Sequence, residues 1–132
     1  MHSIQNYENS TQNAEYSALL AVRNLQTFFF TRRGIIKAVD GVDLSIQDSE
    51  TLGLVGESGC GKSVTPLSLL QLVSPPGRIV GGTAYLRGED LLSLGEKQMQ
   101  AIRGRKISMI FQEPMTSLDP VFTVGSELIE TL

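Results

Sequence analysis

Residues 56–63 read G-E-S-G-C-G-K-S: a glycine, four further residues and then Gly-Lys-Ser, which is the pattern of a phosphate-binding loop. Such a loop joins a buried strand to the start of a helix. The apolar run at 51–55 suits the strand, and the apolar spacing over 63–73 predicts the helix. At average residue usage, the fixed positions match by chance in roughly one chain of this size in a few hundred. The order strand, loop, helix therefore predicts an α/β fold.

The residue types in this loop suit the binding of a polyanion. The glycines at 56, 59 and 61 have no Cβ, so backbone N–H groups can surround phosphate oxygens closely. The start of the helix adds unpaired N–H groups and the positive end of the helix dipole. Lys62 supplies a mobile cation for the β and γ phosphates, and the Ser63 hydroxyl suits Mg²⁺. The loop thus predicts a magnesium nucleoside triphosphate as the ligand.

The composition predicts an ordinary soluble domain with one modest core, since 41% of the 132 residues are hydrophobic and 19% are charged. Its apolar runs are shorter than the ~20 residues of a membrane-spanning helix, and the polar start lacks the features of a signal peptide. The net charge of −3 gives no electrostatic reason to expect nucleic acid. The single cysteine, Cys60, excludes an intrachain disulfide. A cytoplasmic location is the default expectation.

The pattern along the chain predicts a tail followed by a strand pair and then the loop. Residues 1–18 are polar, and we expect a disordered or loosely attached tail there. Strands at 19–30 and 35–46 are expected to pair antiparallel around a turn at 31–34. Beyond the loop helix, Ser-Pro-Pro-Gly at 74–77 breaks the structure. The remaining expected elements are a short strand at 83–86, a turn at 87–90, a helix at 96–102 and a buried strand at 106–111.

Three segments together resemble the nucleotide-binding subunits of ATP-binding cassette (ABC) transporters. They read K-A-V-D-G-V at 37–42, E-T-L-G-L-V-G-E-S-G-C-G-K-S-V at 50–64 and S-M-I-F-Q-E-P-M-T-S-L-D-P at 108–120. The third segment is the most specific, because it is typical of the branch that imports dipeptides, oligopeptides and related solutes. The resemblance covers residues 19–132. It implies an α/β fold in which an incomplete P-loop NTPase core lies beside an N-terminal antiparallel β subdomain.

The resemblance also implies the site residues, with ATP and Mg²⁺ as ligands. Nucleotide contacts fall on an aromatic ring, Phe29, and on the loop residues Gly56, Glu57, Ser58, Gly59, Cys60, Gly61, Lys62, Ser63 and Val64. Lys62 and Gln112 are the implied catalytic residues, and Ser63 and Gln112 the implied metal ligands. A carboxamide suits the second role, because it donates and accepts hydrogen bonds without adding charge. Without the resemblance, Gln112 would be interpreted as a surface residue at the end of a strand.

The ring under the adenine has three candidates, Phe28, Phe29 and Phe30. Motif spacing favours Phe29. Strand alternation places Phe28 and Phe30 on one face, so at least one of the three rings is expected to be ordinary core. Pro66 is a departure from the family pattern, since a proline beyond the first turn would delay or kink the helix.

The family pattern implies partners beyond this chain. They are transmembrane permease subunits, a second ATPase subunit in a homo- or heterodimer, and indirectly a periplasmic or extracellular solute-binding protein, with the subunit peripheral to the cytoplasmic face of a bacterial-type membrane. The family's signature motif, second acidic strand and switch histidine lie beyond the matched segments. We therefore expect residues 19–132 to be the N-terminal part of a longer subunit with little or no turnover of its own. An apolar helix face is expected to begin with Val124, Leu128, Ile129 and Leu132.

Two alternatives stay open at this point. One is a non-catalytic nucleotide-binding fragment. The other is an unrelated P-loop kinase or GTPase, against which the chain shows no guanine-reading Asn-Lys-x-Asp sequence.

Overall fold

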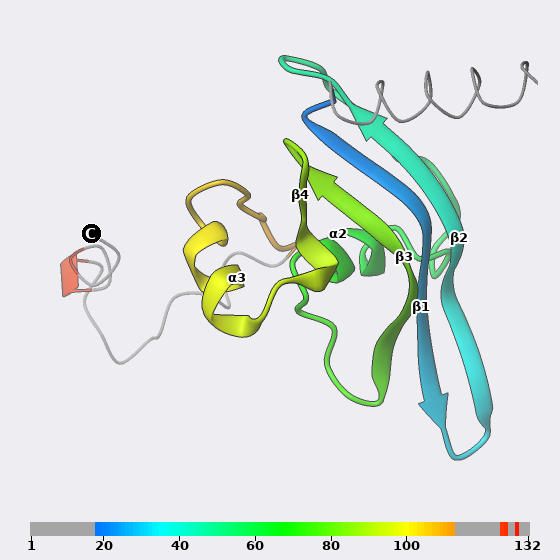
Figure 1. Cartoon of the computed structure of the whole chain (residues 1–132). Helices are drawn as coiled ribbons and strands as arrows, with labels where there is room; N and C mark the ends of the chain where they lie inside the picture. The colour runs from blue at the N-terminus through cyan, green and yellow to red at the C-terminus, as the bar shows by residue number, and fades with distance from the viewer. Residues whose placement is uncertain (1–17, 113–124, 127–128, 130–132) are drawn as a thin grey trace, which may run out of the picture.

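The computed structural model describes residues 18–112, 125–126 and 129 (Figure 1). A four-stranded antiparallel sheet with the order β2-β1-β3-β4 forms its centre, and a short helix, α2, packs against one face. The elements are β1 (Leu20–Thr31), β2 (Gly34–Ile46), α2 (Val64–Leu69), β3 (Gly77–Leu86), β4 (Glu89–Asp90), a 3₁₀ helix (Leu91–Ser93) and α3 (Glu96–Ile102). No helix among the described residues has the length and apolar character needed to cross a bilayer.

The long hairpin of β1 and β2 confirms the predicted antiparallel pair, with Leu20 opposite Ile46 and Phe30 opposite Ile35. A bulge interrupts β1 at Asn24, whose φ is 45° and whose N–H donates to the Asp43 carboxylate at 2.7 Å. Asparagine tolerates this left-handed conformation better than most residues. The bulge changes the alternation, so the buried positions before and after it lie on the same face of the sheet.

The second strand of the hairpin, β2, forms one edge of the sheet and contains two further irregularities. Gly41, with φ of 80°, is skipped between the pairs that join β1 to Val42 and Asp40. Ala38 is skipped in the same way, between the pairs of Val39 and Lys37. Each skipped residue is a β-bulge, which turns its backbone groups away from the hydrogen-bond ladder.

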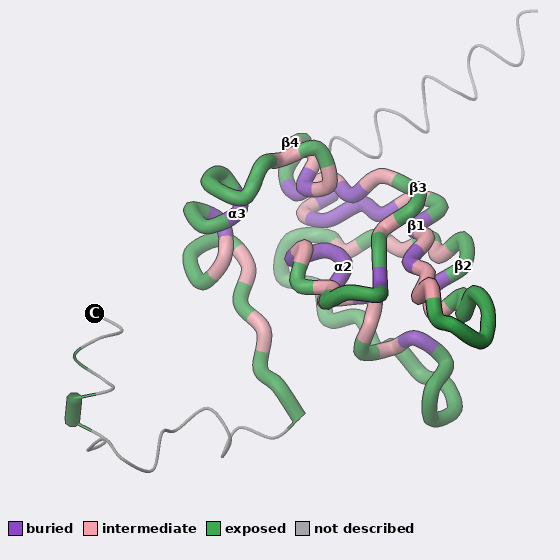
Figure 2. The backbone as a smooth tube through the Cα atoms, turned by 90° about the horizontal axis from the view of Figure 1, so that it is seen from below, coloured by how far each residue is buried: buried purple, intermediate pink, exposed green. Residues whose placement is uncertain are grey.

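The hydrophobic core lies between the sheet and the helices, where Figure 2 shows buried stretches of β1, β3 and α2 facing one another. Its largest fully buried side chains include Leu25, Leu91 and Met99. A buried hydrogen bond of 2.7 Å joins Thr27 Oγ1 of β1 to Ser68 Oγ of α2. This bond fixes the loop helix over the middle of β1.

The helix predicted at 63–73 is shorter than expected, because α2 ends at Leu69. Gln71 adopts a φ of 51°, its N–H donates to the Ser68 carbonyl at 3.0 Å, and the Leu72 N–H donates to the Leu67 carbonyl at 2.8 Å. This pair of bonds is the Schellman ending of a helix. Pro66 lies in the first turn of α2, where proline is tolerated, and the helix begins at Val64 without delay.

The two predicted buried strands at 51–55 and 106–111 are wrong. Residues 51–57 form no strand, and Leu54 and Val55 are 48% and 99% exposed. In the second run only Ile107 makes an isolated bridge, to Arg103, and Ile110 is 91% exposed. A buried strand needs neighbouring strands at its edges and cover on its faces. Within the described residues nothing supplies either to these two runs, so their apolar composition alone does not make them strands.

Other predictions from the sequence have mixed outcomes. The helix at 96–102 is confirmed by α3, and the strand at 83–86 belongs to the longer β3. The turn at 87–90 is confirmed only at 87–88, since Glu89 and Asp90 form β4. Residues 1–17 of the expected tail lie outside the described residues, whereas Ala18 is buried. Val124, Leu128 and Leu132 of the expected apolar face also lie outside them, and Ile129 is 74% exposed.

Candidate functional site

The phosphate-binding loop and Gln112 share one cavity of about 390 Å³. Its lining residues come from β2, the loop, the start of α2 and the segment after α3: Ala38, Ser58, Gly59, Gly61, Lys62, Ser63, Val64 and Gln112. Residues far apart in the sequence therefore line one space. Of the residues expected from the sequence to form the site, Gly56, Glu57, Cys60 and Phe29 do not line this cavity.

The loop touches the sheet at Gly61, which is buried and has a φ of 89°. A Cβ at this position would lie 2.1 Å from the carbonyl oxygen of Ala38. Only glycine fits both this contact and this backbone conformation. Ala38 lies in a bulge of β2, and its carbonyl oxygen faces Gly61 of the loop.

Ala38 is the cavity residue that sequence reasoning missed. Its contact with the loop is made by the backbone carbonyl, and its position depends on a β-bulge. The type of side chain at a position predicts neither of these. The available signal was its place in the K-A-V-D-G-V segment at 37–42, which was used only for the family resemblance.

The Lys62 ammonium lies inside the turn of the loop. Its Nζ donates hydrogen bonds to the backbone carbonyls of Gly56 and Glu57 and lies 3.4 Å from Cys60 Sγ. A Cβ on Gly56 would be only 2.5 Å from Cys60 Sγ. The flexible lysine stem lets the ammonium exchange these carbonyls for stronger anionic acceptors. The arrangement can therefore hold the loop closed and also supply a cation to phosphates.

Ser63 stands immediately before α2, but its side chain makes no capping hydrogen bond. The hydroxyl therefore makes no capping hydrogen bond to α2, and Ser63 lines the cavity together with Gln112. Among the described residues, no group of three or more His, Cys, Asp or Glu side chains could hold a metal ion. A hydroxyl and a carboxamide suit Mg²⁺, which takes oxygen ligands, keeps several waters and uses substrate phosphates rather than a full protein cage.

The three phenylalanines of β1 divide between the two faces of the sheet. Lys37 Nζ lies 5.2 Å from the centre of the Phe28 ring, and the Arg78 guanidinium lies 4.5 Å from that of Phe30. Arg78 is the cross-strand partner of Phe28, so its contact with Phe30 places both rings on one face. The middle ring, Phe29, lies close to Gly77, where an added Cβ would be 2.7 Å from it.

Phe28 and Phe30 are therefore engaged by cations, whereas the Phe29 ring is directed away from them. All three rings are half-buried. The preference for Phe29 as the adenine-stacking ring stays a prediction, because none of the three lines the cavity.

Comparison with known proteins gives concordant matches. Residues 39–130 match the family model described as ABC transporter. A probable peptide ABC transporter ATP-binding protein of Sinorhizobium fredii is 47% identical over 121 residues, which cover 91% of this chain and 36% of that protein. The oligopeptide transport ATP-binding protein AppD of Bacillus subtilis is 53% identical over 117 residues, 88% of this chain and 36% of that protein.

A third relative is the dipeptide transport ATP-binding protein DppD of Bacillus subtilis. It is 46% identical over 115 residues, which cover 86% of this chain and 34% of that protein. The chain thus spans about a third of the length of the relatives that it matches.

Proposed function

Since the chain belongs to the ABC transporter family, we propose that it binds Mg-ATP in the cavity between the loop 56–64 and Gln112. Family membership confirms the predicted fold class, a P-loop NTPase domain with an antiparallel sheet on its N-terminal side. The observation that carries the proposal is the meeting of Lys62, Ser63 and Gln112 around one cavity. This is the combination of cation, hydroxyl and carboxamide that a magnesium triphosphate requires.

Each group has a distinct part in this proposal. The N–H groups of the glycine-rich loop bind phosphate oxygens, and Lys62 moves from the Gly56 and Glu57 carbonyls to the β and γ phosphates. Ser63 and Gln112 would hold the metal, which would supply charge neutralisation at the phosphates. Gln112 also orients the attacking water, because its carboxamide can accept a hydrogen bond from the water. Phosphoryl transfer depends on such positioning more than on covalent chemistry by the protein.

For the whole subunit, we propose an ATP-hydrolysing role in the import of peptides or related solutes. The names of the relatives, which are peptide, oligopeptide and dipeptide transport ATP-binding proteins, support this solute class. The partners would be transmembrane permease subunits, a second ATPase subunit and, indirectly, a solute-binding protein. The subunit would work at the cytoplasmic face of the membrane. Among the described residues, none that lines the cavity is a carboxylate.

Calorimetric titration of the folded chain with Mg-ATP tests the binding site. Lys62→Ala should weaken binding tenfold to about a hundredfold, because a hydrogen bond to a charged group contributes about 1.5–3 kcal/mol. Lys97→Ala is the matched control, since Lys97 is an exposed lysine of α3 that is not part of the cavity. Mg-ATP should also slow alkylation of Cys60, which is exposed within the loop. Absence of Mg-ATP uptake by folded wild-type protein would refute the proposed site.

Two further measurements separate the alternatives. Phosphate release above background by the isolated chain would contradict the expectation of little turnover. A strong preference for GTP over ATP would overturn the assignment of a ring stacked on adenine, because an aromatic ring stacked on a purine gives no guanine-specific readout.

A further inference from the structure

We propose that Arg103 is a positioning residue for the cavity: it joins the far end of the loop helix α2 to the segment that carries Gln112. This inference rests on the proposed function, because it concerns the distance between the two sides of the same site. Arg103 does not line the cavity and would touch neither nucleotide nor metal. It would act through the two elements that it connects.

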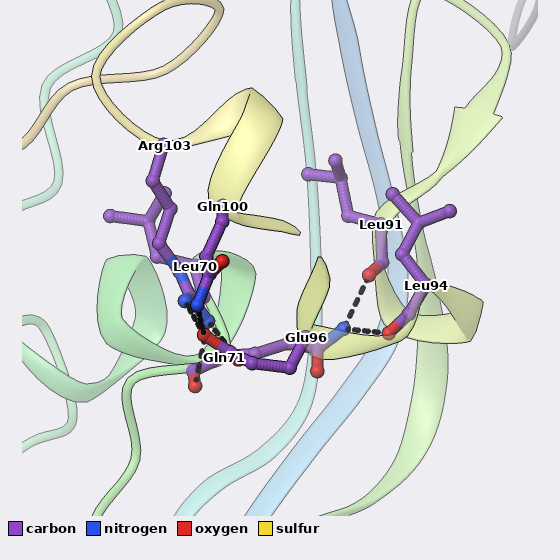
Figure 3. Close-up of polar contacts among 7 residues, drawn as sticks. All are labelled: Leu70, Gln71, Leu91, Leu94, Glu96, Gln100 and Arg103. Carbon is purple, nitrogen blue, oxygen red and sulfur yellow. Dashed lines mark hydrogen bonds and ion pairs between the residues drawn. The ribbon is translucent and has the colours of Figure 1, made fainter. Parts of the chain in front are cut away.

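The Arg103 guanidinium makes four hydrogen bonds, all drawn in Figure 3. Its Nε donates to the Leu70 carbonyl at 2.8 Å, and Nη2 donates to the Gln71 carbonyl at 3.4 Å. Carbonyls at the end of a helix lack helical partners, and a cation there is favourable to the helix dipole. Nη1 and Nη2 donate to the two carboxylate oxygens of Glu96 at 2.6 and 3.2 Å. This two-pronged pairing fixes the plane of the guanidinium.

Two further features make this connection rigid. The Arg103 side chain is only 20% exposed, whereas the ion pairs Lys37–Asp40, Arg87–Asp48 and Lys106–Glu89 are formed by side chains at least 42% exposed. The side chain of Gln71 holds the same end of α2 from another direction, since its Nε2 donates to the Leu91 and Leu94 carbonyls at 2.6 and 3.0 Å. The C-terminal end of α2 is thus attached both to α3 and to the 3₁₀ helix before it (Figure 3).

The opposite end of α2 leads directly to the cavity. The helix begins at Val64, immediately after Lys62 and Ser63. It has only six residues, so we expect a shift of its C-terminal end to turn it as a short rigid body about the Ser68 contact to β1. A displacement at Leu70 would therefore move the groups proposed to bind phosphate and metal.

The chain that follows Arg103 leads to the other side of the cavity. Arg103 ends α3, and a tight turn follows in which Gly104 N–H donates to the Ile107 carbonyl at 2.8 Å and Lys106 N–H donates to the Ile102 carbonyl at 2.8 Å. Arg103 and Ile107 also form a parallel bridge. A short extended segment then reaches Gln112. Both routes that start at Arg103 end at the same cavity, so this residue sets the gap across it.

The test uses the subunit at its full natural length, with Mg-ATP turnover and Mg-ATP affinity measured separately. Arg103→Met should lower kcat by about tenfold to a hundredfold, as expected when reacting groups are misplaced by about 1 Å. The affinity for Mg-ATP should fall as well, because a shift of α2 moves Lys62 and Ser63, which immediately precede it. Arg105→Met is the matched control, since Arg105 lies in the same turn and is exposed. Arg103→Lys should restore little, because an ammonium cannot reproduce the planar fork.

A double-mutant cycle with Gln112→Ala separates positioning from general stability. If Arg103 acts through Gln112, adding Arg103→Met to Gln112→Ala should lower kcat little further. Additive effects, or an Arg103→Met variant that behaves like Arg105→Met, would overturn the inference. Should Arg103→Met fail to fold, Glu96→Gln gives the same test, because the Glu96 side chain is 64% exposed and the Leu70 contact remains. It should show a smaller loss of kcat that is likewise not additive with Gln112→Ala.

The two proposals fail in different ways. A folded wild-type subunit that takes up no Mg-ATP would refute the proposed function itself. An active wild-type subunit with an additive cycle would refute the positioning role of Arg103 alone.

Discussion

The contact between the loop and the bulge of β2 can be tested by two alanine substitutions that differ in one physical respect. Gly59 and Gly61 have φ angles of 83° and 89°, so alanine suffers the same left-handed strain at both, of about 1–2 kcal/mol. A Cβ at Gly59 would meet nothing within 4 Å, whereas at Gly61 it would lie 2.1 Å from the Ala38 carbonyl oxygen. The difference between the two variants therefore measures the close approach to β2.

The size of that difference follows from the geometry. Real Cβ contacts are essentially never shorter than 3.0 Å, so Gly61→Ala requires a shift of about 0.9 Å between the loop and β2. The obstructing atom belongs to the backbone and cannot rotate away. Overpacking of this kind costs about 1–3 kcal/mol. Gly61→Ala should therefore lower the free energy of unfolding by that amount more than Gly59→Ala does.

Chemical denaturation is done without nucleotide, because Gly59 lines the cavity. A phosphate bound there could contact the added methyl group and change the unfolding free energy of Gly59→Ala for a reason other than backbone strain. A second measurement follows Mg-ATP affinity, which should fall further for Gly61→Ala as Lys62 and Ser63 move with the loop. Equal unfolding free energies for the two variants would refute the reasoning. So would a Gly59→Ala variant less stable than Gly61→Ala.

Two further predictions concern the supports of the site. The single proton of the Ser68 hydroxyl goes to the Val64 carbonyl at 2.7 Å, so Thr27 must be the donor in the buried Thr27–Ser68 bond. Thr27→Val should therefore cost about 1 kcal/mol of unfolding free energy. Ser68→Ala leaves the Thr27 hydroxyl without an acceptor and should cost about 1–3 kcal/mol, less about 0.5 kcal/mol gained in helix propensity. Chemical denaturation that gives a Ser68→Ala cost below about 0.5 kcal/mol would contradict the donor assignment. The hydrogen bond from Arg103 is the main cause that holds the pKa of Glu96 below its ordinary value of 4.5. Because the folded pKa is lowered, the stability from this pair is present above pH 4.5 and is lost as the pH falls through the folded pKa. The unfolding free energy of Glu96→Gln, measured on both sides of that pH, should therefore be less acid-sensitive than that of the wild type. Equal acid sensitivity would show that the pair does not stabilise the fold.

The parts of the fold that could be predicted are those set by local patterns. The turn signal at 31–34 between two apolar runs predicted the β1–β2 hairpin, and the helical spacing at 96–102 predicted α3. The strands at 51–55 and 106–111 were wrong because a buried strand is defined by its neighbours rather than by its own composition. The end of α2 was missed because Gln71, and not glycine, adopts the left-handed conformation that closes it.

In the candidate site too, residues set by a local sequence pattern could be predicted, whereas residues set by the pairing of distant elements could not. The loop residues could be proposed from their spacing, because their types follow from the chemistry of a phosphate site, whereas Gln112 could be proposed only from the family resemblance. Ala38 could not, since it contributes a carbonyl from a bulge whose position depends on the pairing of β1 with β2. Arg103 could not either, because its partners at Leu70 and Gln71 are backbone carbonyls about thirty residues earlier in the chain.

The bulge at Gly41 bears on how the outer side of β2, which pairs with no other strand in the described part of the chain, behaves in a concentrated solution. An unpaired strand as long as β2 is a template on which other chains can add strands and grow fibrils. Gly41 interrupts the row of amides and carbonyls, and the charges of Lys37, Asp40 and Asp43 lie on either side of it. An incoming strand would find no long continuous register on this margin. The irregularity thus protects the protein from edge-to-edge aggregation.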